Sequence, residues 1–113
     1  MTVALYAQFT AATGNLAQVT DLIAAFAAEV RAEPGNLVFD PHTRADSPET
    51  IFVYEVYRDQ QSFERHLASL HGHEFNRVLN PLVIGGGSEL SMLLPIPVSV
   101  NAPVVTEPQA VPS

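Results

Sequence analysis

Four histidines, His42, His66, His71 and His73, supply most of the acid–base chemistry that this sequence offers near neutral pH. His66 and His71 lie in a segment with helical spacing of apolar residues, where each is expected at a border between core and solvent. An imidazole in such a place can move one proton, so we expect His71 and His66 to be the candidate general bases. The alternative is that both are hydrogen-bonded structural histidines, and we expect His42 and His73 to be solvated.

The spacing of these histidines does not favour a metal site. On one continuous helix, residues 66 and 71 would lie about 140° apart and residues 71 and 73 about 200° apart, so neither pair shares a face. The sequence contains no HExxH motif and no cysteine, which excludes thiolate ligands, disulfides and iron–sulfur clusters. It also lacks the Walker A, GxGxxG and GxSxG motifs. We therefore expect no metal and no bound cofactor.

Residues 51–58 (IFVYEVYR) form the most strand-like segment and carry three further candidates. Glu55 interrupts the apolar pattern, and a buried carboxylate must be paired or protonated. It is therefore a candidate base or a member of an ion pair. Tyr54 and Tyr57 could line a pocket for an aromatic substrate, or they could simply pack within the sheet.

The elements that would position these residues follow from hydrophobic periodicity and turn signals. An Asn15–Gln18 capping box is expected to start the first helix, residues 45–50 to form a hairpin tip, and Gly72 to bend or interrupt the second helix. The expected strands are residues 2–10, 36–44, 51–58 and 88–94, and the expected helices are residues 16–30 and 60–82. This βαββαβ order predicts an α+β, ferredoxin-like subunit with a four-stranded antiparallel sheet and two helices on one face.

The chain divides into an expected domain over residues 1–94 and a proline-rich tail over residues 95–113, which holds five of the nine prolines. Both faces of the sheet carry apolar side chains, and two helices can cover only one of them. Burying the other face would stabilise a dimer by many kcal/mol, at roughly 25 cal/mol per Å². We therefore expect a homodimer with its sheets face to face; the alternative is that the tail covers the open face.

The charge of the chain excludes several classes of partner. Twelve acidic residues against five Lys and Arg give a formal charge of −7. Nucleic acids and anionic membranes both select basic surfaces, so neither is an expected partner. The sequence has no apolar run long enough to span a membrane and begins without the basic start of a secretory signal, so we expect a cytoplasmic protein.

Three short segments, in order and at the expected spacing, resemble the antibiotic biosynthesis monooxygenase family of dimeric α/β-barrel proteins, which includes quinol monooxygenases. They are AEPGNL at residues 32–37, FVYEVYRD at residues 52–59, and HLASLH at residues 66–71 followed by Phe75. The resemblance extends over about residues 3–94 and leaves out the tail. Many relatives have Trp where Tyr57 stands, and this chain has no Trp, which argues against the haem breakdown found in some relatives.

The resemblance implies a monooxygenase that oxidises a phenolic or quinol-type aromatic molecule with O₂ and no cofactor. His71 or His66 would take the phenolic proton, in an apolar pocket lined by Tyr54 or Tyr57, with Phe39 and Glu55. The family is diverse, and fold alone does not settle function. Two alternatives stay open: a non-oxidative isomerase that uses histidine proton transfer, and a non-catalytic dimeric module that binds a small molecule.

Overall fold

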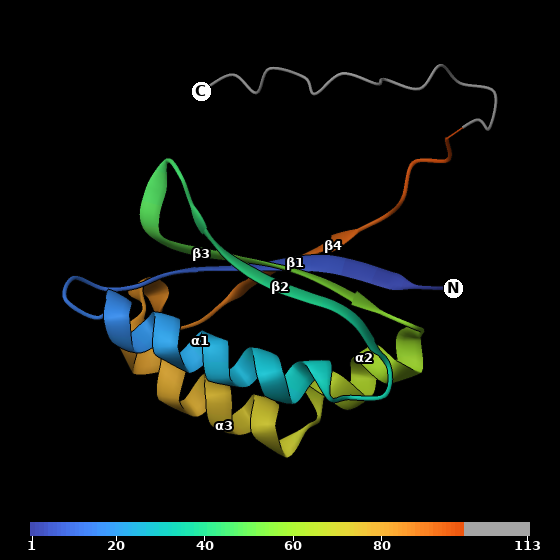
Figure 1. Ribbon diagram of the computed structural model, residues 1–113, viewed down its shortest axis with the longest axis horizontal. Helices are drawn as coiled ribbons and strands as arrows, with labels where there is room; N and C mark the ends of the chain where they lie inside the picture. Colours follow the sequence, from blue (N-terminus) through green and yellow to red (C-terminus); the bar gives the residue numbers. More distant parts are fainter. Residues whose placement is uncertain (99–113) are drawn as a thin grey trace.

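The computed structural model describes residues 1–98 of the chain and shows one antiparallel sheet covered by helices on a single face (Figure 1). The strands, in the spatial order β2-β3-β1-β4, are β1 (Val3–Thr10), β2 (Asn36–Arg44), β3 (Ser47–Tyr57) and β4 (Glu89–Leu93). The α-helices are α1 (Leu16–Arg31), α2 (Gln60–Leu67) and α3 (Leu70–Leu79), and two single 3₁₀ turns, Asn80–Leu82 and Ile84–Gly86, lead to β4. The predicted ferredoxin-like α+β fold is confirmed.

Strict alternation along the two central strands decides which side chains face the helices. β1 pairs with β3 so that Leu5 lies opposite Glu55 and Ala7 opposite Val53, and all four are buried on the inner face. The apolar stripe of α1 packs onto that face through its buried residues Val19, Ile23, Phe26, Ala27 and Val30. The predicted and observed faces agree because the sequence displays the two periods, 2.0 residues for a strand and 3.6 residues for a helix.

The second helix differs from its prediction. The sequence predicts a bend or an interruption at Gly72, whereas the chain is interrupted earlier, at Ala68 and Ser69, and forms two helices. The Ser69 hydroxyl donates to the His66 carbonyl over 2.7 Å and accepts from the Gly72 N–H over 3.1 Å. One side chain therefore binds the end of α2 and caps the start of α3. The break leaves Leu67 and Leu70 exposed rather than in the core.

Two smaller expectations are also corrected. Asn15 makes no side-chain cap, because its amide instead donates to the Leu82 carbonyl over 3.2 Å. The hairpin tip is only two residues long, and β3 begins at Ser47. Hydroxyl bonds of 2.8 Å from Ser47 to Thr50 and 2.9 Å from Thr50 to Thr10 hold this polar stretch in the sheet.

The outer face of the sheet lies away from all three helices (Figure 1). It carries the even-numbered residues of β3, Phe52, Tyr54 and Val56, and the Tyr6 ring stacks on Phe52 with centroids 4.7 Å apart. Of the expected tail, residues 95–98 have no regular secondary structure, and residues 99–113 lie outside the described part. No helix within residues 1–98 is both long and apolar enough to cross a membrane.

Candidate active site

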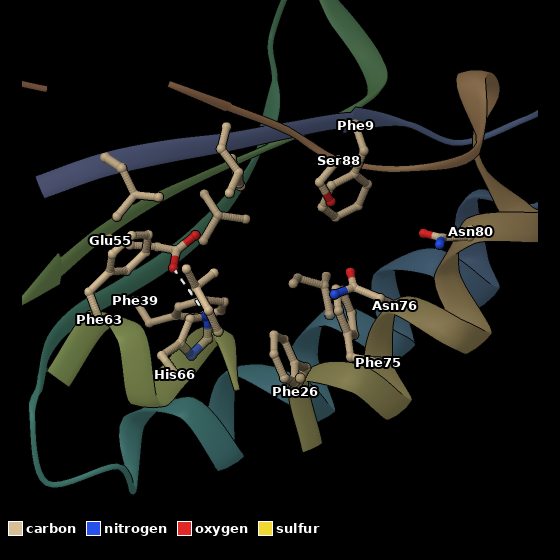
Figure 2. A pocket seen from close by; sticks show the side chains of 17 residues that line it. Phe9, Phe26, Phe39, Glu55, Phe63, His66, Phe75, Asn76, Asn80 and Ser88 are labelled. Carbon is tan, nitrogen blue, oxygen red and sulfur yellow. Dashed lines mark ion pairs between the residues drawn. The ribbon is translucent and has the colours of Figure 1, made fainter. Parts of the chain in front are cut away.

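A cavity of about 350 Å³ lies between the inner face of the sheet and the helices (Figure 2). Aromatic side chains form much of its wall: Phe9, Phe26, Phe39, Phe63 and Phe75. Phe26 and Phe75 stack with ring centroids 4.0 Å apart, which makes that side of the wall flat. Such an enclosure suits a small planar apolar molecule, and its volume lies within the range of small-molecule sites.

Polar groups lie at two ends of this cavity. Figure 2 shows Glu55 and His66 close together at one end and Asn76, Asn80 and Ser88 at the other. The His66 Nε2 atom is 3.8 Å from Glu55 Oε1. Glu55 and His66 are both shielded from solvent, whereas Asn76 and Asn80 are exposed. The pair that can exchange protons is thus at the more buried end.

Glu55 is held by a second buried residue. The Tyr57 hydroxyl donates to Glu55 Oε1 over 2.7 Å, and both residues are buried. Burial raises the pKa of Glu55, while the hydrogen bond from Tyr57 and the proximity of His66 oppose that rise. Burial also raises the pKa of Tyr57, and the neighbouring Glu55 charge adds to it. Tyr57 is therefore a hydrogen-bond donor to Glu55 and remains a neutral phenol.

Glu33 joins two histidines on the side of His66 that faces away from Glu55. His66 Nδ1 lies 2.9 Å and His71 Nε2 lies 2.6 Å from the same atom, Oε2 of Glu33. A carboxylate accepts, so His66 Nδ1–H is the donor in this pair. A neutral His66 then carries its free acceptor at Nε2, which faces Glu55 and the cavity. Glu33 thus sets His66 in the form a general base needs.

Glu33, His66 and His71 also place metal-ligating atoms within 4.8 Å of one another. Both ring nitrogens lie at hydrogen-bond distance from one shared oxygen, as expected for two N–H···O bonds. We therefore interpret the three residues as a hydrogen-bonded cluster. On one continuous helix, His66 and His71 would not share a face. That expectation is wrong here, because the break at Ser69 turns both histidines toward the same carboxylate.

The structure separates the predicted site residues into three groups. Phe39, Glu55 and His66 line the cavity. Tyr57 lies behind Glu55 and supports it, with its ring centroid 4.9 Å from that of His66. Tyr54 and His71 are outside the cavity.

The positions of Tyr54 and His71 have simple geometric causes. Tyr54 and Tyr57 are an odd number of residues apart on one strand, so the pleat puts them on opposite faces, and Tyr54 lies on the outer one. His71 lies at the start of α3, beside a shallow depression that is also lined by Glu29 and Glu74. His42 and His73 are exposed, and they take no part in the cavity.

Glu33 is a candidate site residue that the sequence did not predict. It follows the last residue of α1 by two positions, where the helix dipole disfavours a negative charge. Leu5, Ala7 and Phe9 also line the cavity, and no sequence signal distinguishes them from core residues, because a cavity wall and a packed core have the same apolar pattern.

Similarity to known proteins identifies the family of this chain. The family model for antibiotic biosynthesis monooxygenase matches residues 2–78. The solved structure of Rv0793 from Mycobacterium tuberculosis is 22% identical, with a TM-score of 0.78 over 88% of this chain and 99% of that chain. PA3566 from Pseudomonas aeruginosa is 27% identical, with a TM-score of 0.77 over 85% and 95% of the two chains.

A proposed antibiotic biosynthesis monooxygenase from Nitrosomonas europaea is 16% identical, with a TM-score of 0.76 over 81% and 88% of the two chains. Where identity is this low, the likeness shows the fold alone. A comparison with curated proteins finds no match. Because the family model covers more than half of the sequence, from β1 into α3, the chain belongs to the antibiotic biosynthesis monooxygenase family.

Proposed function

We propose that this protein is a cofactor-independent monooxygenase that oxidises a phenolic or quinol-type aromatic molecule with O₂. The observation that carries the proposal is the aromatic-walled cavity of about 350 Å³, which has one shielded acid–base pair, His66 and Glu55, in its wall. Membership of the family supports the reaction type. The substrate ring would lie against Phe26 and Phe75, with its hydroxyl toward His66.

In this proposal His66 is the general base. Its Nε2 takes the phenolic proton while its Nδ1–H stays bound to Glu33. The electron pair remains on the phenolate oxygen, and the electron-rich ring then reduces O₂. The substrate supplies all four electrons: one oxygen atom becomes a carbonyl of the quinone product, and the other leaves as water.

Glu55 and Phe39 contact the substrate in this proposal, and the apolar wall excludes water from the phenolate. Glu55 has a raised pKa and is buried beside His66. A proton held there could return to the reduced oxygen, so the two residues would divide base and acid between them. Tyr57 acts through Glu55 as a positioning residue.

We also propose that the working unit is a homodimer. The outer face of the sheet carries Tyr6, Phe52 and Val56, only partly buried within one subunit, together with exposed Tyr54. A second copy offers the same apolar face, and pairing the two faces would remove both from water. The proposed active site lies on the opposite side of the sheet, so it is built within one subunit.

The test is oxygen uptake by the purified protein with a panel of hydroquinones and anthrone-type phenols. His66→Asn should lower the rate by about 100-fold or more. His73→Asn, which changes an exposed histidine on α3, is the matched control and should leave the rate unchanged. The proposal fails if the wild-type protein binds these compounds without consuming O₂, which would favour the binding module, or if it isomerises them without O₂.

A further inference from the structure

The cluster around Glu33 connects the cavity with the surface. The exposed fraction of the side chain rises step by step along it, from 5% for Glu55 to 11% for His66, 14% for Glu33 and 27% for His71. Phe26 separates the two imidazoles from the core on one side, with centroid distances of 6.1 Å to His66 and 5.9 Å to His71. His66 therefore faces the cavity and His71 faces solvent, and both bind the same Glu33 carboxylate.

One carboxylate can balance one imidazolium cation. Two imidazolium rings on the same Glu33 oxygen would repel each other at short range, in a place where water screens them weakly. The other acidic groups nearby are unequally placed. Glu55 on β3 faces His66 from the cavity side, while Glu29 on α1 and Glu74 on α3 line the depression beside His71. The outer histidine thus lies beside more carboxylates than the inner one.

We propose that His71 carries the one positive charge of this cluster at rest and is a proton outlet that keeps the charge of the cluster constant, and this inference rests on the proposed function of His66. When His66 Nε2 takes a proton from the substrate hydroxyl, the O–H bond breaks and a new N–H bond forms. At the same time His71 loses its Nδ1 proton to water or buffer, because Glu33 can balance only one cation. When Glu55 has protonated the reduced oxygen and His66 passes its own proton on to Glu55, His71 takes one from solvent.

No proton needs to cross Glu33 in this scheme. His66 Nδ1–H and His71 Nε2–H stay donated to Oε2 throughout, and protons are gained and lost only at the two outer nitrogens. Among the described residues, no hydrogen bond involves His71 Nδ1, which leaves this atom for exchange with solvent. His71 is therefore a positioning residue: it acts through the charge that it places beside His66, and it does not touch the substrate.

The experiment uses 4-nitrophenol, whose anion absorbs visible light, as a redox-inert probe at about pH 6, where a typical histidine is largely protonated. Absorbance reports the bound phenolate. Calorimetry in two buffers of different ionisation enthalpy reports the protons that leave the protein. The wild type should form phenolate and release about one proton per site. In His71→Asn the one charge that Glu33 balances lies on His66 at rest, so this variant should bind the neutral phenol without a rise in absorbance and release about none. His73→Asn should behave as the wild type.

Release of the proton by His71→Asn as well would overturn the inference, because the outlet would then be elsewhere. Absence of bound phenolate in the wild type would instead show that the proposed base role of His66 fails. ¹⁵N NMR of the ligand-free, histidine-labelled protein at the same pH then tests whether the two imidazole rings share one positive charge. His71→Asn should raise the protonated fraction of His66, and an unchanged fraction contradicts the shared charge.

Discussion

The Tyr57 hydroxyl donates a hydrogen bond to Glu55 Oε1 over 2.7 Å, and neither residue is appreciably exposed to solvent. Tyr57→Phe removes this donor and leaves a buried carboxyl without it. The pKa of Glu55 should rise further, because this hydrogen bond opposes the effect of burial. The free energy of unfolding should fall by about 1–3 kcal/mol. Chemical denaturation and the infrared band of a protonated carboxyl measure the two effects, and Tyr54→Phe, on the outer face, should change neither.

The pH dependence of stability should carry the signature of Glu55. Burial raises the pKa of Glu55 above its value in the unfolded chain, so the folded protein binds that proton more tightly. The free energy of unfolding should therefore be highest below the unfolded pKa, about 4.3, and should fall as pH rises through the folded pKa. Glu55→Gln removes this fall while its amide oxygen still accepts from Tyr57.

The comparison is made by denaturation of both proteins across a pH series. The stability of Glu55→Gln relative to the wild type should increase with rising pH. Glu64→Gln, which changes an exposed carboxylate on α2, controls for the change in net charge. A difference between Glu55→Gln and wild type that is constant with pH would contradict the assignment.

The turn after Glu33 depends on the absence of a side chain at Gly35. A Cβ atom built there would lie 2.2 Å from both Cβ and Oγ of Ser62, a residue of α2. Gly35→Ala should cost about 1–3 kcal/mol in unfolding free energy. Adding Ser62→Gly should recover much of this loss, reduced by about 1 kcal/mol for glycine in a helix. Gly87→Ala, whose Cβ would meet nothing closer than 3.8 Å, is the control and should be nearly neutral.

Filling the cavity should weaken binding without unfolding the protein. Ala7 is buried on β1 and contributes to the cavity wall. Ala7→Leu points a larger side chain into the empty space, so the affinity for a hydroquinone should fall about tenfold or more, which corresponds to about 1.4 kcal/mol. Isothermal titration measures it. Ala24→Leu, on an exposed face of α1, should bind as the wild type does; equal binding by Ala7→Leu would place the ligand elsewhere.

The proposed dimer makes a direct prediction for sedimentation. The wild type should sediment as a dimer at micromolar concentration, and Phe52→Glu, which puts a charge on the outer face beside Tyr6, should sediment as a folded monomer. Ala24→Glu adds the same charge to α1 and should remain dimeric. A well-folded wild-type monomer at this concentration would disprove the pairing of sheets.

The sequence predicted the elements that rest on simple periods. The alternation in β1 and β3 and the stripe of α1 are confirmed, since each depends on residues close in the chain. The break between α2 and α3 was placed three residues late, because Leu67 and Leu70 continue an apolar helical pattern that the hydrogen bonds of Ser69 override. Local hydroxyl chemistry competes with hydrophobic spacing there, and a pattern count does not weigh it.

The site was predictable only in part for the same reason. Glu55 and His66 stand out as polar residues in apolar surroundings, and both line the cavity. The bridge from Glu33 to His71 joins residues 38 positions apart, and its existence depends on the helix break. Tyr54 and Tyr57 carry the same chemistry in the sequence, and only the phase of the pleat, fixed by pairing with β1, distinguishes them.

Alternate residues of β3 face opposite sides of the sheet and determine different properties of the protein. Its odd-numbered residues from Ile51 to Tyr57 are buried toward the helices, and its even-numbered residues from Phe52 to Val56 point the other way. Whether a position is odd or even therefore tells which property a substitution disturbs. Inserting or deleting a single residue in this strand would exchange the two sets at once, so this stretch should tolerate point changes far better than changes of length.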